Sequence, residues 1–400
     1  WIEHEVSGVL EDAQPIRVLR DEDLDALCAQ RRKIDFHRAD YGTADARTAL
    51  AILYTSGTTG RPKGAVLSRA AFLASAAGSA VRLGWQADDR WLLCLPLCHI
   101  GGLSIVTRCV LARRPIVLLP RFDAASVLAA IERDKATLVS VVPTMLRTLL
   151  DADADADVDD RSIMRRLRAV ISGGAATPFS LLEHAVARGV NVLTTYGLTE
   201  ACSQVTLQTF NPQPRAQRGS GVPLPGVEVV LRGEDGAALP LGAVGRICVR
   251  GPTLMDGYLH GTPRGAEYFD TGDLGELDER GVLHVKARRT ELIVTGGENV
   301  YPAEVEQAMA EVPGIARALV FGVPDAKWGD AVAAAIVAER SADVPRLLDA
   351  LLAGLQARLS PFKRPRFLAV VEALPELPSG KPDRRRAVET IASLLRPFPR

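Results

Sequence analysis

The sequence predicts an α/β protein with a large N-terminal region, a small β subdomain within it, and a smaller α+β domain towards the C-terminal end. Short apolar runs alternate with helix-forming segments through the first part of the chain, which is the pattern of a parallel sheet covered by helices on both faces. From about residue 220 the apolar runs are separated by Gly, Pro and Asp turns, as expected for a β subdomain. After about residue 290 a second β/α set follows, and it is long enough to fold alone.

The strands and helices of the large region are expected in a regular order. Apolar runs predict strands at 49–54, 91–97, 115–120, 137–143, 167–174 and 190–197, the last two running into glycine turns. Helix formers predict helices at 68–84, 123–134 and 179–189. Ser68 offers an N-cap side chain to the first helix, and Pro143 ends the strand at 137–143.

The β subdomain and the C-terminal domain are predicted from the change in pattern. Strands are expected at 227–233, 245–251 and 281–287 in the subdomain, and at 317–325, 331–339 and 366–374 in the C-terminal domain. Pro302 marks the first turn of one helix, and a second helix is expected at 345–359. The boundary between the two domains is placed near 287–291, where the pattern of the subdomain ends.

Composition narrows the class of function. The formal net charge is zero and no basic region dominates, which argues against nucleic acid or an anionic membrane surface as a partner. No apolar run reaches the roughly 18 residues of a membrane span, and the N-terminus lacks signal-peptide features. Six scattered cysteines without a CxxC pair argue against zinc and favour the cytoplasm. The acidic run at 151–160 is interpreted as a surface loop, because it lacks the glycine and late glutamate of a calcium loop.

The stretch YTSGTTGRPKG at 54–64 is the strongest chemical signal. It follows a predicted strand directly and precedes a helix, which is where α/β proteins bind phosphate groups. Its hydroxyl, glycine and lysine residues suit a loop that surrounds an anion with N–H and O–H donors, namely Thr55, Ser56, Gly57, Thr58, Thr59, Gly60 and Lys63. It is not a Walker A loop, since Gly60 is followed by Arg-Pro-Lys-Gly. A surface loop without a ligand is the alternative.

Two further stretches offer residues for a nucleotide. In TTYGLTE at 194–200, Tyr196 has a flat face for a base, and Glu200 is a carboxylate suited to Mg²⁺ beside phosphate. In YFDTGDLGEL at 268–277, Asp273 suits the two hydroxyls of a ribose. Taken singly, Tyr196 would more often be a core residue, Glu200 a solvated charge and Asp273 a turn former.

Two single residues complete the candidates. Lys381 lies in LPSGKPDRR at 377–385, where the composition predicts an exposed loop, although a lone loop lysine is usually inert. His99 follows a predicted buried strand in LPLCHIGG at 95–102, where a structural histidine is the alternative. The stretch SPFK at 360–363 fits the S-x-x-K pattern of penicillin-binding proteins, but the partner motifs are missing and the match is treated as chance.

Taken together, five motifs resemble, in their order and spacing, those of the adenylate-forming superfamily. That superfamily comprises acyl-CoA synthetases, adenylation domains and luciferases. The motifs are YTSGTTGRPKG, TTYGLTE, YFDTGDLGELDERGVLHVKAR, TELIVTGGENVYPAEVE and LPSGKPDRR, and the resemblance covers about residues 48 to 390. It implies the adenylate-forming fold with a mobile C-terminal domain. It also implies ATP with Mg²⁺, a carboxylic acid and coenzyme A as reactants, through an acyl-adenylate that CoA converts to a thioester.

Within this superfamily, LPLCHIGGLSIVTRCV and TYGLTEACSQVTL resemble the 2-succinylbenzoate–CoA ligases of menaquinone biosynthesis. VTGGENVYP and FKRP are similar in benzoate-type ligases, so a benzoate-type or medium-chain acyl-CoA ligase stays open, as does a stand-alone enzyme that loads a carrier protein. A nucleotide-binding regulator without catalysis is disfavoured, because binding alone would not require Lys381. The acid used and the formation of a homodimer are left open.

The resemblance implies a role for each motif residue. The loop from Thr55 to Gly60, with Lys63, would hold the β- and γ-phosphates of ATP. The adenine would be framed by Gly173, Gly174, Ala175, Tyr196 and Gly197. The α-phosphate and Mg²⁺ would be held by Thr199 and Glu200, and the ribose by Asp273 and Arg288. Lys381 would bridge the substrate carboxylate and the α-phosphate, where negative charge develops in the first step.

The same resemblance divides the chain into a large domain at 1–287, a hinge at 288–290 and a small domain at 291–400. Thr290 stands at the hinge position, where many relatives carry Asp or Lys. Gly296 and Gly297 would line the pantetheine channel, and His99 would stand at the mouth of the acyl pocket. The second carboxylate of the acid would be held by Ser203, Gln204 and Thr206. Only 54 residues precede Thr55, which predicts a compact form or an incomplete first subdomain.

Overall fold

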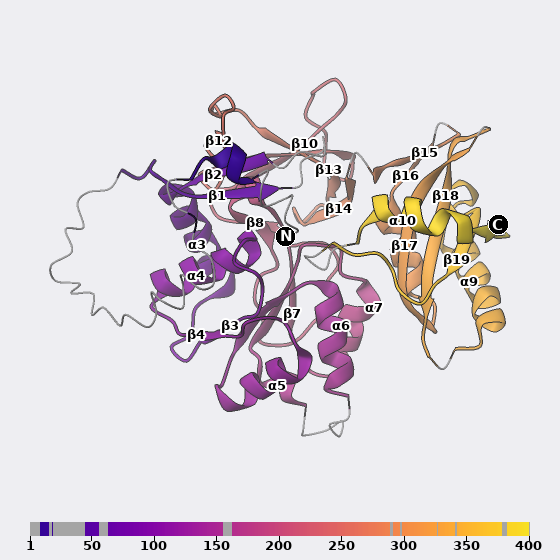
Figure 1. The fold of residues 1–400 in the computed structure, drawn as a ribbon, viewed down its shortest axis with the longest axis horizontal. Coiled ribbons are helices and arrows are strands. Elements are labelled where there is room, and N and C mark those ends of the chain that lie inside the picture. The colour runs from indigo at the N-terminus through magenta and orange to yellow at the C-terminus, as the bar shows by residue number, and fades with distance from the viewer. Residues whose placement is uncertain are drawn as a thin grey trace.

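The computed structural model describes residues 9–15, 18, 45–55, 63–154, 162–288, 291–296, 298–325, 327–340, 342–377 and 382–399, with Arg288 described for its backbone alone. Figure 1 shows a large body drawn in indigo to red and a smaller one in orange to yellow beside it. Residues 9–13 are helical. The predicted α/β class, with a large N-terminal and a smaller C-terminal domain, is confirmed. No membrane-spanning helix is found in the described part of the chain, where every helix is too short or too polar.

A seven-stranded sheet forms the centre of the large domain, in the order β4-β3-β5-β6-β7-β8-β9. Its strands are β3 (Trp91–Leu93), β4 (Ile116–Leu118), β5 (Leu138–Val141), β6 (Ala169–Ser172), β7 (Val192–Leu198), β8 (Ser203–Leu207) and β9 (Val222–Pro223). The pairs from β4 to β7 are parallel, as the sequence predicts, whereas β8 and β9 pair antiparallel. The carboxyl ends of the parallel strands therefore lie at one edge, where α/β proteins bind ligands.

Helices cover both faces of this sheet because successive strand residues point to opposite sides. Trp91 packs in a core with Ile105, while the adjacent Leu92 packs in a second core with Val127. The helices are α3 (Arg69–Leu83), α4 (Ile100–Ala112), α5 (Ala124–Arg133), α6 (Pro143–Ala152) and α7 (Phe179–Ala187), with the 3₁₀ turns η1 (Ile163–Arg166) and η2 (Thr199–Ala201).

Two of these helices, α4 and α6, were missed by the sequence analysis. The first turn of α4 contains two glycines, which weaken any pattern of helix formers. Pro143 ends the predicted strand but also opens α6 at its first position, where proline is favoured.

Two antiparallel sheets complete the large domain. One has the order β1-β2-β12 and consists of β1 (Ala49–Thr55), β2 (Lys63–Ser68) and β12 (Gly257–Tyr258). The other confirms the predicted β subdomain, in the order β10-β11-β13-β14, and consists of β10 (Glu228–Arg232), β11 (Val244–Arg250), β13 (Phe269–Leu277) and β14 (Leu283–Arg288).

The small domain has its own sheet and its own cores. Its strands are β15 (Ile293–Thr295), β16 (Glu298–Val300), β17 (Ile315–Asp325), β18 (Gly329–Ala338), β19 (Phe367–Val370) and β20 (Arg396–Pro397). Its helices are α8 (Pro302–Ala310), α9 (Val344–Arg358) and α10 (Arg384–Ile391), with η4 (Pro361–Lys363) and η5 (Ala392–Leu394). Alternate residues of β17 serve the two faces: Val320 packs with α8 and α9, and Phe321 packs on the side of α10.

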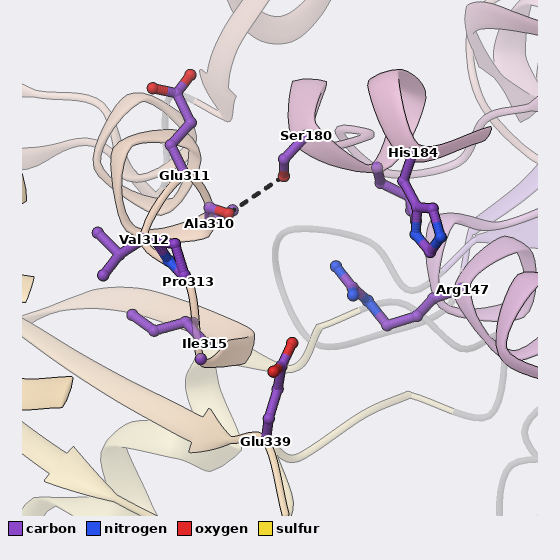
Figure 2. A pocket seen from close by; sticks show the side chains of 11 residues that line it. Arg147, Ser180, His184, Ala310, Glu311, Val312, Pro313, Ile315 and Glu339 are labelled. Atoms are coloured by element: carbon purple, nitrogen blue, oxygen red, sulfur yellow. Dashed lines mark hydrogen bonds between the residues drawn. The ribbon is translucent and has the colours of Figure 1, made fainter. Parts of the chain in front are cut away.

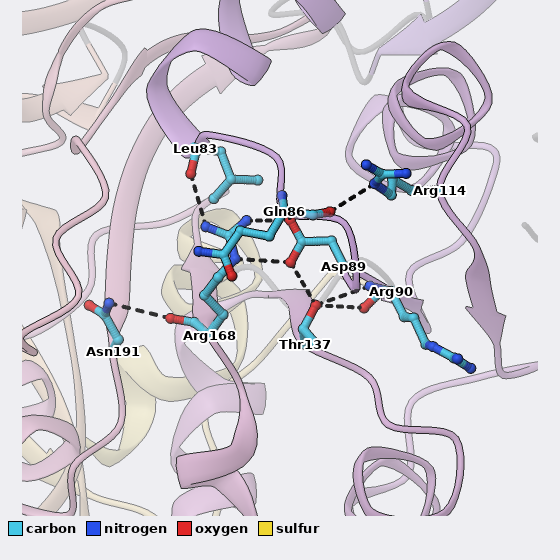
Figure 3. A network of polar contacts seen from close by, with 8 residues as sticks. All are labelled: Leu83, Gln86, Asp89, Arg90, Arg114, Thr137, Arg168 and Asn191. Atoms are coloured by element: carbon cyan, nitrogen blue, oxygen red, sulfur yellow. Dashed lines mark hydrogen bonds and ion pairs between the residues drawn. The ribbon is translucent and has the colours of Figure 1, made fainter.

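A buried ion pair joins the amino ends of the parallel strands (Figure 3). Arg168, just before β6, donates from Nη2 and Nε to the two carboxylate oxygens of Asp89 at 2.6 and 2.9 Å. Thr137, just before β5, donates its hydroxyl to the same carboxylate at 2.9 Å. Because Asp89 is fully buried, this network fixes the strand edge opposite to the ligand-binding edge.

Polar contacts join the two domains (Figure 2). The hydroxyl of Ser180 on α7 donates to the carbonyl of Ala310 on α8 at 3.1 Å. Beside this contact lies a hollow of about 230 Å³, with His184 on one side and Glu339 on the other. Burial, followed by the charge of Arg188, lowers the pKa of His184.

Candidate active site

The two ends of the phosphate loop face each other across a pair of strands. Thr55 ends β1 and Lys63 begins β2, and the two residues are paired in the antiparallel register. The Nζ atom of Lys63 lies 5.6 Å from the centre of the Tyr258 ring. The other predicted members of this loop, Ser56, Gly57, Thr58, Thr59 and Gly60, lie outside the described residues. Their phosphate-binding role stays a prediction.

Glu200 lies close to this loop through Tyr258. The Tyr258 hydroxyl donates to Oε1 of Glu200 at 2.8 Å, and Tyr258 is opposite Ala65 of β2. Glu200 belongs to η2, which begins at Thr199 immediately after β7. One tyrosine therefore connects the strand that follows the phosphate loop with the Thr-Glu motif.

The surroundings of Glu200 fit the magnesium role expected from its sequence motif. Tyr258 occupies one carboxylate oxygen, and the described residues give the other oxygen no partner. No group of three or more His, Cys, Asp or Glu side chains suited to a metal occurs among them. Mg²⁺ at phosphate sites usually has one or two carboxylate ligands and takes the rest from phosphates and water. A single carboxylate beside the phosphate loop fits that arrangement.

The predicted base and ribose residues are in direct contact. The hydroxyl of Tyr196 on β7 donates to Oδ2 of Asp273 on β13 at 2.6 Å. Asp273 is 6% exposed and lies within a strand, so the alternative that it merely forms a turn is wrong. The backbone of Arg288 is paired with Asp273 across β13 and β14, which places the two predicted ribose residues side by side. A carboxylate has about four acceptor sites, so ribose hydroxyls can share it with Tyr196.

Glycines allow close packing at the adjacent edge of the sheet. The predicted adenine-framing residues Gly173, Gly174 and Ala175 follow β6 directly. A Cβ on Gly173 would lie 2.6 Å from Cγ2 of Thr195, closer than side chains approach one another. A Cβ on Gly197 would overlap the carbonyl of Ser203. Only glycine fits at these two positions, because neighbouring protein atoms occupy the space that a Cβ would take.

His99 stands at the start of α4. It is half-buried and is the N-cap residue of that helix, at the carboxyl side of β3. This is the same edge of the sheet as the glycine turn after β6. Its role at the mouth of an acyl pocket stays a prediction.

The three residues predicted to hold a second carboxylate do not lie together. Ser203 faces α4, where its hydroxyl contacts Nη2 of Arg108 and Oγ of Ser104, both at 3.2 Å. Thr206 is fully buried and donates its hydroxyl to the carbonyl of Ser220 at 2.6 Å. Gln204 is buried, and its Oε1 has no hydrogen-bond partner within the described residues. Of the three, only Ser203 has a cation beside it.

That cation, Arg108, was missed by the sequence analysis. Its side chain is 4% exposed, and its guanidinium lies 5.7 Å from the centre of the Trp91 ring. Within the described residues no carboxylate pairs with it, and its Nε has no hydrogen-bond partner. Burial lowers the pKa of Arg108 to about 10. The available signal was a single arginine inside the otherwise apolar helix IGGLSIVTRCVLA.

Tyr258 was also missed, because no motif in the sequence points to it. It lies on a two-residue strand between Gly and Leu, with no chemical motif nearby. Only the pairing of β12 with β2 brings it to the phosphate loop.

In the small domain the site residues are described in part. Gly296 has a φ of 61°, and its N–H donates to the carbonyl of Trp328 at 2.8 Å. A Cβ at this position would meet the Trp328 ring at 2.7 Å, so the turn requires glycine. Gly297, Lys381 and the hinge residues 289–290 lie outside the described residues.

Known families match the chain over both domains. Residues 4–259 match the family described as AMP-binding enzyme, and residues 304–381 match the AMP-binding enzyme C-terminal domain. The chain belongs to the AMP-binding enzyme family. The predicted superfamily and its AMP-forming chemistry are therefore confirmed, whereas the roles of the individual site residues stay predictions.

Similar curated proteins from Bacillus species share the name 2-succinylbenzoate–CoA ligase. The 2-succinylbenzoate–CoA ligase of Bacillus licheniformis is 39% identical over 376 residues, covering 92% of this chain and 74% of that one. The enzyme of that name from Bacillus thuringiensis subsp. konkukian is 37% identical over 354 residues, covering 87% and 71%.

Solved structures resemble the chain over almost its whole length. The o-succinylbenzoate CoA synthetase (MenE) of Bacillus subtilis in complex with the acyl-adenylate OSB-AMP has a TM-score of 0.77, at 31% identity, covering 96% of this chain and 80% of that one. ATP-bound MatB from Rhodopseudomonas palustris has a TM-score of 0.83, at 30% identity, covering 98% and 82%. Both resemblances support the assignment of this AMP-binding enzyme to the adenylate-forming fold.

Proposed function

We propose that this protein is an ATP-dependent acid–CoA ligase that converts 2-succinylbenzoate to 2-succinylbenzoyl-CoA in menaquinone biosynthesis. The curated relatives with that name support the reaction, as does the resemblance to the Bacillus subtilis enzyme with its acyl-adenylate. ATP with Mg²⁺ and coenzyme A are the co-reactants.

The observation that carries the choice of acid is Arg108. 2-Succinylbenzoate has two carboxylates, and only one of them reacts. A buried guanidinium without an acidic partner costs several kcal/mol, and a substrate carboxylate placed beside it would offset much of that cost. Arg108 and Ser203 form a cationic, hydrogen-bonding corner behind the Thr-Glu motif. A simple benzoate or a fatty acid has no group to match this corner.

In the first half-reaction a carboxylate oxygen of the acid attacks the α-phosphorus of ATP. The bond from that phosphorus to the bridging oxygen breaks, and pyrophosphate leaves with the electron pair. Lys63 and the phosphate loop would hold the β- and γ-phosphates, and Asp273 with Tyr196 would hold the nucleoside. Bound Mg²⁺, held by Glu200, would supply positive charge to the phosphates. Lys381 would stabilise the charge that develops between carboxylate and phosphate.

In the second half-reaction the sulfur of coenzyme A attacks the acyl carbon. The carbon–oxygen bond to the phosphate breaks, AMP leaves, and the thiol proton passes to solvent. Since the two steps need different groups beside the acyl carbon, the small domain would turn about the hinge at 288–290 between them. We assign 1–287 to the large domain and 291–400 to the small domain on this basis. The described cysteines, none of them in a disulfide, fit the reducing cytoplasm as the site of reaction.

An acid panel tests the proposal. AMP release is measured in the presence of CoA with 2-succinylbenzoate, benzoate and a medium-chain fatty acid, and in parallel with a carrier protein replacing CoA. The diacid is expected to give the highest kcat/KM, and only with CoA. A higher kcat/KM for benzoate or the fatty acid would show that 2-succinylbenzoate is not the preferred acid. Acyl transfer to the carrier protein but not to CoA would show that the protein is not a CoA ligase.

A further inference from the structure

The turn formed by Cys202 and Ser203 has a strained backbone. These two residues are consecutive, neither is glycine, and both have positive φ angles, of 50° and 93°. Such conformations cost free energy and persist only where surrounding contacts fix them, which is most often at functional sites. The strained turn lies directly after η2, which carries Glu200, and Ser203 begins β8. It therefore links the predicted magnesium residue to the residue that contacts Arg108.

One contact that fixes the strained turn comes from a helix distant in sequence. The hydroxyl of Ser75 on α3 donates to the carbonyl of Cys202 at 2.6 Å, in the interior of the protein. The carbonyl oxygen of Cys202 lies in the same peptide plane as the N–H of Ser203. Holding that oxygen therefore sets the orientation of the plane, and with it the φ angle of Ser203.

Helix stability does not explain why a serine occupies position 75. Ser75 is 2% exposed in the alanine-rich helix RAAFLASAAGSAVRL, where alanine would be the better helix former. A buried hydroxyl is costly unless it is hydrogen bonded, and the same holds for a buried carbonyl. The hydrogen bond between Ser75 and Cys202 satisfies both groups, and it does so where the backbone is strained.

The strained turn also determines where the Ser203 hydroxyl lies. That hydroxyl contacts Nη2 of Arg108 and Oγ of Ser104, both at 3.2 Å and both on α4. The carbonyl of Ser203 lies so close to Gly197 on β7 that a Cβ there would overlap it. Ser203 is thus held by α4 through its hydroxyl and by β7 through its carbonyl, while α3 holds the peptide that precedes it.

We propose that Ser75 is a positioning residue for recognition of the acid. By holding the peptide between Cys202 and Ser203, it directs the Ser203 hydroxyl to Arg108, where the unreacted carboxylate would bind. This inference rests on the proposed function, in which Arg108 and Ser203 bind that carboxylate.

The test compares two serines of one helix. Ser75→Ala leaves the carbonyl of Cys202 without this partner. Ser79→Ala is the control, because Ser79 is equally buried one turn further along α3 and donates no hydrogen bond to the strained turn within the described residues. The quantities measured are kcat/KM for 2-succinylbenzoate, kcat/KM for benzoate, and KM for ATP. Ser75→Ala is expected to lower kcat/KM for the diacid at least fivefold and to change the other two less than twofold. Ser79→Ala is expected to change none of the three by more than twofold.

A structural role alone would lower kcat/KM for both acids to the same extent, and that result would overturn the inference. Ser75→Cys has nearly the same size but only a weak donor, so it remains a test if the alanine variant does not fold. An unchanged ratio of the two kcat/KM values in the folded cysteine variant would also overturn it. Arg108→Met is the reference: if it lowers kcat/KM for both acids alike, the proposed binding of the second carboxylate fails. If it affects the diacid selectively while the Ser75 variants do not, the positioning role alone fails.

Discussion

Replacing Arg108 by methionine should separate stability from substrate binding. At pH 7 the arginine is charged in both the folded and the unfolded chain. Its pKa, lowered by burial to about 10, therefore measures a cost to folding that is fully present below that pH. That shift corresponds to about 3 kcal/mol. Methionine keeps most of the length of the side chain and removes the charge. We therefore expect the free energy of unfolding of the ligand-free enzyme to stay the same or to rise.

The same substitution should lower kcat/KM for the diacid. Removing one partner of a buried charge pair costs about 3–5 kcal/mol, because the other charge is left without compensation. For the unreacted carboxylate of 2-succinylbenzoate this corresponds to a loss of at least about a hundredfold in kcat/KM. Benzoate places nothing beside Arg108, so its kcat/KM should change by less than about threefold, a free-energy change within RT ln 3.

The assay combines urea denaturation of the ligand-free protein with kcat/KM for both acids. Arg113→Met is the matched control, because Arg113 is an exposed arginine just past the same helix and contributes no side-chain hydrogen bond. If the Arg108→Met enzyme is less stable and loses kcat/KM for both acids to the same extent, Arg108 has a structural role. The assignment to the second carboxylate would then be refuted.

Three further predictions follow from other contacts. Asp89→Ala leaves Arg168 buried without its carboxylate, so the free energy of unfolding measured in urea should fall by about 3–5 kcal/mol. The KM for ATP should not change, and a loss of stability below about 1 kcal/mol would contradict this prediction. Tyr258→Phe removes a hydrogen bond to a carboxylate, about 1.5–3 kcal/mol, so a Mg²⁺ titration of pyrophosphate release should shift at least several-fold to higher concentration. An unchanged titration would mean that Tyr258 does not orient Glu200. The pKa of His184 is lowered, so the folded protein favours its neutral form. Relative to His184→Gln, the wild type should lose thermal stability progressively as the pH falls below 6.5, and parallel melting curves would contradict the lowered pKa of this side chain.

The sequence was informative where chemistry is concentrated in short motifs. Thr55 and Lys63 were predicted as the ends of one loop, and the structure pairs them across two strands. Tyr196 and Asp273 were assigned to the same nucleoside from motifs more than 70 residues apart in sequence, and they are hydrogen bonded. Such residues can be predicted because each belongs to a short motif that stands out in the sequence, whether it ends a strand, as Thr55 does, or lies within one, as Asp273 does.

Residues whose role depends on packing could not be predicted in this way. Arg108 gains significance only from being buried without an acid, and Tyr258 only from a strand pairing that joins distant segments. The grouping of Ser203 with Thr206 could not anticipate that Thr206 is fully buried and hydrogen bonded to the carbonyl of Ser220. Register and burial are tertiary properties, and no local pattern contains them.

An exposed ion pair between the two domains suits a two-step reaction. Arg218 of the large domain lies 3.7 Å from Glu311 of the small domain and is 58% exposed, and exposed pairs contribute about 1 kcal/mol or less. Such an interface can open within a catalytic cycle, whereas an apolar one of similar size would hold the domains together. Arg108, on the large domain, would stay beside the spare carboxylate through both steps. Lys63 would lose the β- and γ-phosphates when pyrophosphate leaves, and Lys381 would move away with the small domain before coenzyme A attacks.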